Sequence, residues 1–315
     1  MTNKKINLTI IGAGLWGQVL ATLAKHNRQN NVRIWSRKST ESLADLVKEA
    51  SVIVSAVSMK GVRPTIEKLQ TLKIPEETIF VTATKGLDAV TTLTPSQIWQ
   101  ETFPTNSVVV LSGPNLSEEI KKGLPAATVV SSKNITAAET VQEIFSSDIF
   151  RVYVNNDPIG TELGGTLKNV MAIASGVCDG LQLGTNAKSA LLTRALPEMI
   201  RVGMALGASP ETFFGLSGLG DLIATCDSPL SRNYRVGYGL SQGKTLEEIL
   251  TELKSTAEGV NTTNVLIELA KNYKIAIPIS HQVYRLLNRK ITPKEAVKEL
   301  MARHLKAEFD DLDFM

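Results

Sequence analysis

Apolar and polar positions alternate in two different ways along this chain. Up to about residue 155, short β-branched and apolar runs are separated by turns and by segments with helical periodicity. This alternation predicts an α/β domain with a doubly wound, mostly parallel sheet. The expected strands are 6–11, 32–35, 52–57, 78–83, 107–111, 126–130 and 150–154, and helices are expected after residue 17 and over 39–50 and 136–145.

From Asn156 onward the strand signal nearly disappears and helical periodicity takes over. Asp157 suits the N-cap of a long apolar helix, and Pro158 suits the first position of that helix. Further helices are expected over 187–206, after an N-cap at Ser231, after residue 260, and from Glu295 to an acidic end. We therefore expect two domains, an N-terminal Rossmann domain over 1–155 and an all-α domain over 156–315, which agrees with the length of 315 residues.

Residues 12–17, Gly-Ala-Gly-Leu-Trp-Gly, lie between the first expected strand and the first expected helix. In a dinucleotide-binding unit the first glycine permits the tight turn, the second lets the backbone approach a pyrophosphate, and the third lets the helix pack closely on the strand. Gly12, Gly14 and Gly17 have these positions, and the helix start offers free N–H groups to phosphate. The pattern predicts a dinucleotide site; a glycine-rich turn that binds nothing is the alternative.

The residues after the second strand bear on the choice of cofactor. In NAD-binding units an acidic residue near this point bonds the ribose 2′-hydroxyl. Here the chain has Ser36, Arg37 and Lys38 instead. A hydroxyl and two cations suit a 2′-phosphate, so the sequence favours NADP(H) over NAD(H). A solvated basic turn is the alternative.

Five polar residues occupy positions where packing of the fold alone does not require a polar side chain. Lys168 and Asn169 lie within an apolar helix that contains several glycines. A lysine there is either a chance surface residue or a cation held against a reacting oxygen, and if buried it needs anionic or polar partners. Lys85 follows a strand at the edge where parallel sheets bind ligands, and an ordinary loop lysine is the alternative. Asp221 ends a glycine-rich segment, where a plain N-cap is the alternative, and Arg232 stands at a helix start that suits a phosphate.

Composition narrows the class of protein. The 43% hydrophobic share, the 21% charged share and the formal net charge of +3 are ordinary for a globular protein. Without a block of five like charges or a run of 18 uncharged apolar residues, nucleic-acid binding and membrane insertion are disfavoured. Cys178 and Cys226 form no CxxC pair, which favours a reduced, cytoplasmic setting. The three histidines form no close cluster with cysteines or carboxylates, so no metal site is expected.

Seven short motifs occur in one order over nearly the whole chain. They are GAGLWG at 12–17, ATKGL at 83–87, SGPN at 112–115, ELGGTLKN at 162–169, GLGDL at 218–222, SRN at 231–233 and AEGV at 257–260. In this combination the chain resembles the NAD(P)-dependent glycerol-3-phosphate dehydrogenases of the bacterial type. The resemblance implies a Rossmann domain, a helical domain and an active site between them. It also implies reversible hydride transfer between NAD(P)H and dihydroxyacetone phosphate, which gives sn-glycerol 3-phosphate for glycerophospholipid synthesis.

The resemblance also implies roles for individual residues. Lys168 matches the catalytic lysine that exchanges a proton with the substrate oxygen, and Lys85 matches a second lysine that contacts substrate and cofactor. Arg232 and Asn233 match the phosphate anchor, and Arg232 also lies near the cofactor. The other substrate positions are Gly113, Asn115, Asn169, Asp221 and Ser231, and the other cofactor positions are Gly12, Gly14, Leu15, Trp16, Gly17, Arg37, Ser117, Thr256 and Glu258.

The chain departs from the family pattern in two places. Asn115 stands where many relatives have threonine, and only a short segment joins Arg37 to the third strand where relatives usually carry a much longer one. We therefore expect a loop at the cofactor edge or the substrate edge to be missing. A β-hydroxyacid dehydrogenase of related architecture is the enzymatic alternative, and a non-catalytic dinucleotide-binding sensor is the alternative from another class. The SRN and GLGD segments favour glycerol phosphate chemistry, and a homodimer is compatible with the sequence.

Overall fold

The computed structural model describes residues 6–26, 30–253, 256–305 and 307–308. Contacts between Cα atoms divide the chain into two units, which we call the sheet unit and the helical unit. The sheet unit comprises Met1–Asp88 and Leu93–Glu162, and the helical unit comprises Ala89–Thr92 and Leu163–Met315. The sequence-based division at residues 155 and 156 stays a prediction.

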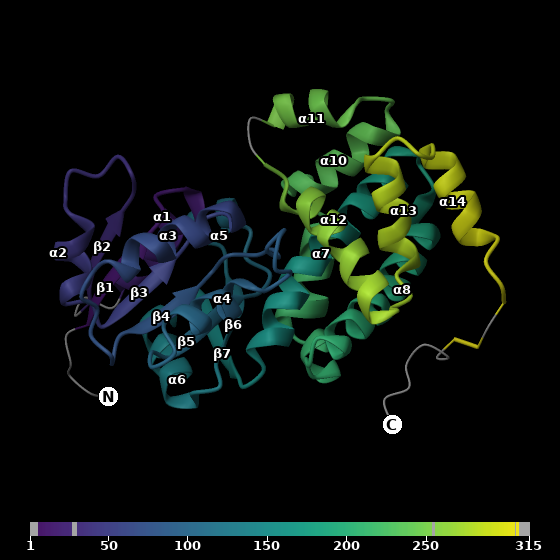
Figure 1. The fold of residues 1–315 in the computed structure, drawn as a ribbon. Helices are drawn as coiled ribbons and strands as arrows, with labels where there is room; N and C mark the ends of the chain where they lie inside the picture. The colour runs from purple at the N-terminus through teal and green to yellow at the C-terminus, as the bar shows by residue number, and fades with distance from the viewer. Residues whose placement is uncertain (1–5, 27–29, 254–255, 306, 309–315) are drawn as a thin grey trace. The chain divides into compact units, whose positions relative to one another are not determined.

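The sheet unit is built on a seven-stranded sheet with the order β2-β1-β3-β4-β5-β6-β7 (Figure 1). All neighbouring pairs are parallel except β5 and β6, which are antiparallel, so the predicted doubly wound, mostly parallel sheet is confirmed. Strand bounds differ from the expected ones by one or two residues. The strands are β1 Asn7–Ile11, β2 Asn31–Trp35, β3 Val52–Ser55, β4 Ile79–Thr82, β5 Val108–Ser112, β6 Ala126–Ser131 and β7 Phe150–Asn155.

Helices cover both faces of this sheet because successive side chains of a strand point to opposite faces. Ile10 belongs to a core cluster with residues of α1, α5 and α6, whereas Ile11 belongs to a second cluster with residues of α2, α3 and α4. The helices are α1 Leu15–His26, α2 Leu43–Lys48, α3 Met59–Gln70, α4 Pro95–Thr102, α5 Ser117–Lys121 and α6 Ile135–Phe145.

The prediction of a helix over 39–50 is wrong at both ends, because α2 covers only Leu43–Lys48 and Ser42 is its N-cap residue. The Ser39 hydroxyl does not cap this helix. It accepts a hydrogen bond from the Ser36 backbone N–H at 2.9 Å, which closes a turn directly after β2. Serine favours such local turns over helix interiors, and this competition shortened the helix.

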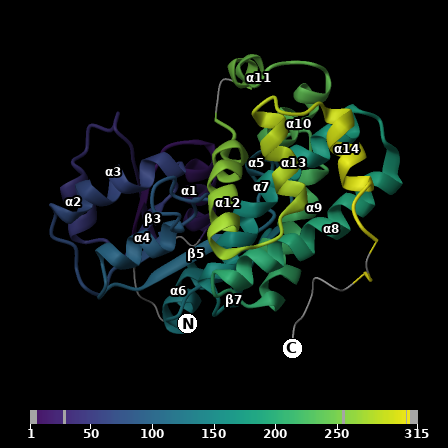
Figure 2. The ribbon, with the colours of Figure 1, turned by 45° about the vertical axis from the view of Figure 1, so that its right-hand side comes forward.

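The helical unit is all α, as expected, and Figures 1 and 2 show its helices as one group. Gly160 N–H donates to the Asp157 carboxylate at 3.0 Å, and Tyr234 N–H donates to the Ser231 hydroxyl at 3.2 Å, so both predicted N-caps are confirmed. The elements are α7 Pro158–Gly180, α8 Gly184–Ala205, the 3₁₀ helix η1 Pro210–Phe214, the π-helix η2 Leu216–Gly220, α9 Asp221–Cys226, α10 Arg232–Ser241, α11 Leu246–Leu253, α12 Glu258–Tyr273, α13 Pro278–Leu287 and α14 Pro293–Met301.

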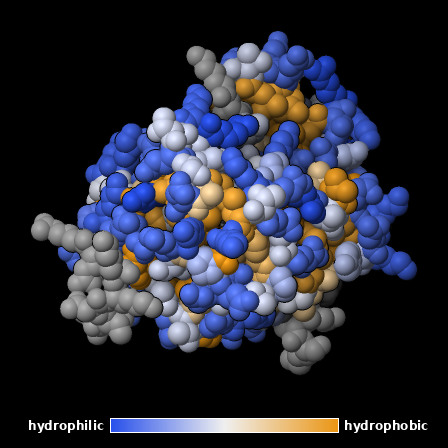
Figure 3. All heavy atoms as spheres, turned by 60° about the vertical axis from the view of Figure 1, so that its left-hand side comes forward, coloured by the Kyte–Doolittle hydropathy of each residue, from blue (hydrophilic) through white to orange (hydrophobic). Residues whose placement is uncertain are grey.

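Hydrophilic residues dominate the face drawn in Figure 3, where apolar side chains form separate patches. Among the residues that the structure describes, no helix is long and apolar enough to span a bilayer. The same residues contain no cluster of three His, Cys, Asp or Glu side chains suited to a metal ion. Cys178 and Cys226 are both buried free thiols, as expected.

Candidate functional site

The turn between β1 and α1 uses its three glycines for different reasons. Gly12 has φ +117°, and a Cβ there would lie 2.5 Å from the Ala56 carbonyl oxygen. A Cβ on Gly17 would lie 1.9 Å from the Gly12 carbonyl oxygen. Packing therefore demands glycine at both positions. A Cβ on Gly14, in contrast, would meet nothing within 4 Å. The turn thus leaves open space beside Gly14, directly before the first residue of α1, where a pyrophosphate fits.

The turn after β2 presents cations to solvent. Arg37 and Lys38 are exposed, and Arg37 has no hydrogen bond or ion pair to another described residue. The Ser36 hydroxyl accepts from Lys38 N–H at 3.3 Å and thereby shapes the turn. The turn therefore carries two exposed cations after Ser36, and such cations can pair with a 2′-phosphate.

Lys85 and the Ser112–Asn115 turn lie together at one edge of the sheet. They follow β4 and β5, which are parallel neighbours, so both segments leave the sheet at its carboxyl edge. The Lys85 ammonium donates to the Gly113 carbonyl oxygen at 3.2 Å. The structure therefore brings these two segments into contact, at the edge where such sheets bind ligands.

Thr128 fixes the conformation of this turn and was not anticipated from the sequence. Its hydroxyl donates to the Ser112 carbonyl oxygen at 2.8 Å and accepts from the Asn115 side-chain amide at 2.8 Å. Gly113 has φ +152°, and a Cβ there would lie 3.0 Å from the Thr128 Cα. Asn115 therefore orders the turn through its side-chain amide. Ser117, the predicted cofactor contact, is the first residue of α5.

A buried carboxylate that sequence reasoning missed lies in the first part of α7. Glu162 is 2% exposed and accepts from the Ser96 backbone N–H at 2.8 Å and from the Ser96 hydroxyl at 2.5 Å. Burial raises the pKa of Glu162 to about 7, and these hydrogen bonds oppose the shift. Its acceptor bonds satisfy the first turn of α4, where an anion is also favoured by the helix dipole. Glu162 thus holds the residues that precede Lys168 in α7.

In the helical unit, Lys168 is buried among polar partners. Its ammonium donates to the Asp221 carboxylate at 2.9 Å and to the Thr225 hydroxyl at 2.5 Å. The Thr225 hydroxyl also lies 3.2 Å from the same Asp221 oxygen. Exposure is 7% for Lys168, 2% for Asp221 and 4% for Thr225, so the interaction is little screened by water. The chance-surface interpretation of Lys168 is therefore wrong.

The plain N-cap alternative for Asp221 is also wrong, because Gly220 is the N-cap residue of α9 and Asp221 is the first residue of that helix. Thr225 follows four residues later, so both side chains lie on one face of α9. Sequence reasoning missed Thr225, although this i, i+4 spacing from Asp221 was a usable signal.

Three helices meet beside Lys168. Gly259 N–H, in the first turn of α12, donates to the Asn233 side-chain oxygen at 2.9 Å. A Cβ on Gly259 would lie 2.6 Å from the Asn169 carbonyl oxygen. Gly259 on α12 is therefore close to both Asn169 on α7 and Asn233 on α10. The predicted cofactor positions Thr256 and Glu258 lie at this same end of α12, and Thr256 is exposed.

The start of α10 presents a cation and free backbone donors. Ser231 caps the helix and is buried, whereas Arg232 is exposed and has no hydrogen bond or ion pair to another described residue. Unpaired N–H groups of a first helical turn attract anions, and a guanidinium beside them can bind phosphate through two hydrogen bonds. The arrangement suits a phosphate monoester.

Backbone contacts hold α10 and η2 against α7. A Cβ on Gly164 would lie 2.6 Å from the Ser217 carbonyl oxygen, and one on Gly176 would lie 2.0 Å from the Tyr234 carbonyl oxygen. The Asp179 carboxylate on α7 also accepts from Tyr234 on α10 at 2.8 Å and from Lys188 on α8 at 2.7 Å. The glycines of α7 therefore admit neighbouring backbone, and this sets the position of α10 relative to Lys168.

Two family profiles match the chain. The profile described as NAD-dependent glycerol-3-phosphate dehydrogenase N-terminus matches residues 38–138, and the one described as NAD-dependent glycerol-3-phosphate dehydrogenase C-terminus matches residues 157–298. A glycerol-3-phosphate dehydrogenase (NAD(P)+) from Synechocystis sp. is 63% identical over 306 residues, which are 97% of this chain and 96% of the relative. One from Trichormus variabilis is 61% identical over 98% of this chain and 100% of the relative.

Solved structures give the same picture. Glycerol-3-phosphate dehydrogenase from Coxiella burnetii has a TM-score of 0.89 and 33% sequence identity, covering 96% of this chain and 100% of that one. Ketopantoate reductase from Staphylococcus aureus has a TM-score of 0.57 at 14% identity, covering 92% of this chain and 99% of that one. The second likeness shows a shared fold alone.

Proposed function

The chain belongs to the NAD-dependent glycerol-3-phosphate dehydrogenase family, and we propose that it catalyses reversible reduction of dihydroxyacetone phosphate to sn-glycerol 3-phosphate with NAD(P)H. The observation that carries this proposal is the buried cluster of Lys168, Asp221 and Thr225. A buried ammonium held by two oxygen partners is a preorganised proton donor for a substrate oxygen. The product supplies glycerophospholipid synthesis.

Each part of the proposed site has its own task. When bound, NAD(P)H supplies the hydride that reaches the substrate carbonyl carbon. Lys168 gives a proton to the carbonyl oxygen in reduction and takes it back in oxidation. Asp221 and Thr225 hold the Lys168 ammonium in place. Asn169 and Asn233, which the contacts with Gly259 bring together, line the substrate position.

The phosphate group is assigned to the start of α10, with Arg232 and Asn233 as its anchor. Replacing Arg232 by alanine should raise KM for dihydroxyacetone phosphate about 10- to 100-fold, because one hydrogen-bonded charge pair is worth about 1.5–3 kcal/mol. Steady-state kinetics should show a much smaller change in KM for NADPH. Arg235→Ala is the matched control, since Arg235 is also exposed on α10 but lies one turn later. Equal KM increases in both variants would remove Arg232 from the anchor.

The cofactor is assigned to the β1–α1 turn, where open space beside Gly14 suits a pyrophosphate. Gly14→Val should raise the dissociation constant of NADPH at least about tenfold while the melting temperature stays near that of the parent. Gly17→Val is the contrasting control: its side chain would meet the Gly12 carbonyl oxygen, so it should destabilise the fold itself. Isothermal titration and thermal melts measure both effects. Unchanged NADPH affinity in Gly14→Val would exclude this position from the cofactor site.

The exposed cations after β2 support a preference for NADP(H), with NAD(H) as the weaker cofactor. Side-by-side assays of NADPH and NADH oxidation, with dihydroxyacetone phosphate and with a panel of β-keto acids, test reaction and cofactor together. Turnover of the β-keto acids alone would favour a β-hydroxyacid dehydrogenase. NADPH binding without any turnover would favour a non-catalytic sensor. A cytoplasmic setting and a homodimer also remain proposals, and fractionation of cells and sedimentation of the purified chain test them.

A further inference from the structure

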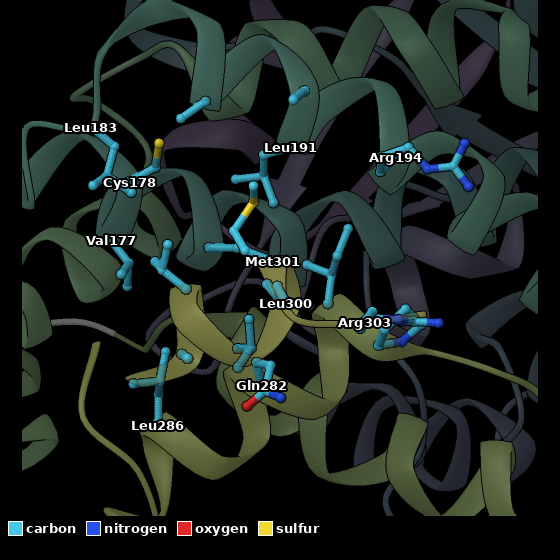
Figure 4. Close-up of a pocket in the computed structure, with 18 of the residues that line it drawn as sticks. Val177, Cys178, Leu183, Leu191, Arg194, Gln282, Leu286, Leu300, Met301 and Arg303 are labelled. Carbon is cyan, nitrogen blue, oxygen red and sulfur yellow. The ribbon is translucent and has the colours of Figure 1, made fainter. Parts of the chain in front are cut away.

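The helical unit holds an apolar pocket that none of the candidate site residues line. Its volume is about 430 Å³, within the range of pockets that bind small molecules or peptide side chains. Helices α7, α8, α13 and α14 and residues 301–305 surround it. We call it the α8 groove, and its apolar lining includes Val177, Leu183, Leu191, Val283, Leu286 and Leu300 (Figure 4).

One side of the α8 groove is strongly basic. Arg194, Arg201 and Arg303 line it together with His304. In Figure 4, Arg194 and Arg303 lie on one side of the pocket, whereas Cys178 and Leu183 lie on the opposite side. Burial lowers the pKa of Arg201, and the charges of Arg194 and Arg303 lower it further. A bound anion would reduce the electrostatic repulsion among these three guanidinium groups.

The nearby carboxylate of Glu198 has another role, although it offsets part of this charge. Glu198 is buried, and its two oxygens accept from Ile279 N–H at 2.8 Å and from Ser280 N–H at 2.9 Å, in the first turn of α13. Burial raises the pKa of Glu198. The basic side of the groove therefore suits further negative charge.

The chain itself arrives at this basic side. The Arg194 guanidinium donates to the backbone carbonyl oxygen of Glu308 at 2.7 Å. Seven residues follow, Phe309 to Met315, and they lie outside the described part of the structure. Their sequence, Phe-Asp-Asp-Leu-Asp-Phe-Met, contains three carboxylates and four apolar side chains. This composition is complementary to an apolar groove with a basic side.

We propose that residues 309–315 bind in the α8 groove of their own chain, with their apolar side chains in the pocket and their aspartates toward the arginines. Seven extended residues span up to about 23–25 Å. The groove residues on α8 run from Ala187 to Arg201, which is about 21 Å along a helix. The segment is therefore long enough. A short tether gives an effective concentration in the millimolar range, so even a weak contact is occupied. This inference is independent of the proposed enzyme activity.

A variant that ends at Glu308 tests the proposal. It should melt about 2–8 °C below the full chain and should bind an apolar fluorescent dye that the full chain binds weakly. A labelled peptide of residues 306–315 should bind the shortened variant at least about tenfold more tightly than it binds the full chain, because the full chain's own segment competes. Equal peptide affinity for both proteins, or binding to neither, overturns the proposal.

Two matched controls separate the contributions to peptide binding. A peptide with Asp310, Asp311 and Asp313 changed to asparagine should bind the shortened variant more weakly, and the difference should shrink at high salt. Arg303→Ala in the shortened variant should lower the affinity for the acidic peptide and leave the affinity for the asparagine peptide nearly unchanged. If both peptides bind both proteins equally, the charge complementarity on which the proposal rests is absent.

A groove-filling variant of the full chain covers the case in which the shortened chain does not fold. Ala190 lines the groove and is exposed. The larger side chain of Ala190→Trp should therefore displace the segment, and carboxypeptidase should release Met315 and Phe314 faster than from the parent. Mass spectrometry measures the rate of release. An unchanged release rate overturns the proposal. Two other occupants of the groove give different results.

If a second copy of the chain occupied the groove, Ala190→Trp would change the sedimenting mass, and removing residues 309–315 would leave that mass unchanged. If a small amphiphile occupied it, dodecanoate would bind the full and the shortened chains equally. Either result also overturns it.

Discussion

Replacing Lys168 by alanine is expected to lower kcat for dihydroxyacetone phosphate reduction by about 10²- to 10⁴-fold, the usual contribution of a positioned general acid. The structure supplies the reason, since the ammonium is 7% exposed and is held by Asp221 at 2.9 Å and by Thr225 at 2.5 Å. NADPH affinity should stay close to that of the parent, because the glycine turn assigned to the cofactor lies in the sheet unit. Stopped-flow turnover and NADPH fluorescence titration measure the two quantities.

The same substitution also removes the cation that pairs with a buried carboxylate, and such a loss costs about 3–5 kcal/mol of folding free energy. Lys188→Ala is the matched control for this effect. Lys188 is another partly buried lysine of the helical unit, and it pairs with Asp179 at 2.7 Å and with Asp227 at 2.9 Å. The control should lose stability in urea denaturation while kcat falls only several-fold. A Lys168→Ala protein that is folded and keeps near-parental turnover would end the assignment of Lys168 as proton donor.

Much of the sheet unit could be predicted because each of its strands corresponds to a short run of β-branched and apolar residues in the sequence. The fifth strand was expected at 107–111 and covers Val108–Ser112. What the apolar pattern did not reveal is the antiparallel pairing of β5 with β6, which places Val129 opposite Ser112. That register brings Thr128 to the Ser112–Asn115 turn. Sequence reasoning missed Thr128 because strand pairing depends on the whole sheet and not on the local run of residues.

In the helical unit, too, the sequence pattern predicts some polar site residues and misses others. Lys168, Asn169 and Asp221 could be found because an ionisable or amide side chain is conspicuous in an apolar or glycine-rich segment. Thr225 is not conspicuous in this way, since a threonine in a short helix is ordinary, and its i, i+4 spacing from Asp221 was the one signal for it. Its role depends on the packing of α9 against α7, which brings together residues 57 positions apart. Glu162 and Ser96 are 66 positions apart and illustrate the same point. Local pattern therefore finds only the conspicuous polar side chains, and packing decides which donors and acceptors meet.

Gly237 provides the second large expected effect, because α10 rests on α7 through backbone contact. A Cβ on Gly237 would lie 1.8 Å from the Ile173 carbonyl oxygen and 2.9 Å from the Val177 backbone nitrogen. In an open helix, Gly→Ala would stabilise by about 1 kcal/mol. Here the methyl group meets backbone that cannot move aside alone, so Gly237→Ala should destabilise by about 3 kcal/mol or more. Urea denaturation measures this loss as a lower free energy of unfolding.

Gly239→Ala on the same helix is the matched control. Its added methyl group would meet only the Ile249 side chain, at 2.7 Å, and a side chain can change rotamer more readily than a helix backbone can shift. The loss of stability should therefore be clearly smaller than at Gly237. The two variants should also differ in function, because displacing α10 from α7 moves Arg232 and Asn233 relative to Lys168. KM for dihydroxyacetone phosphate should rise in Gly237→Ala at temperatures where the protein is still folded, and should change little in Gly239→Ala. Equal stability and equal KM in the two variants would mean that backbone contact at Gly237 does not position the phosphate anchor.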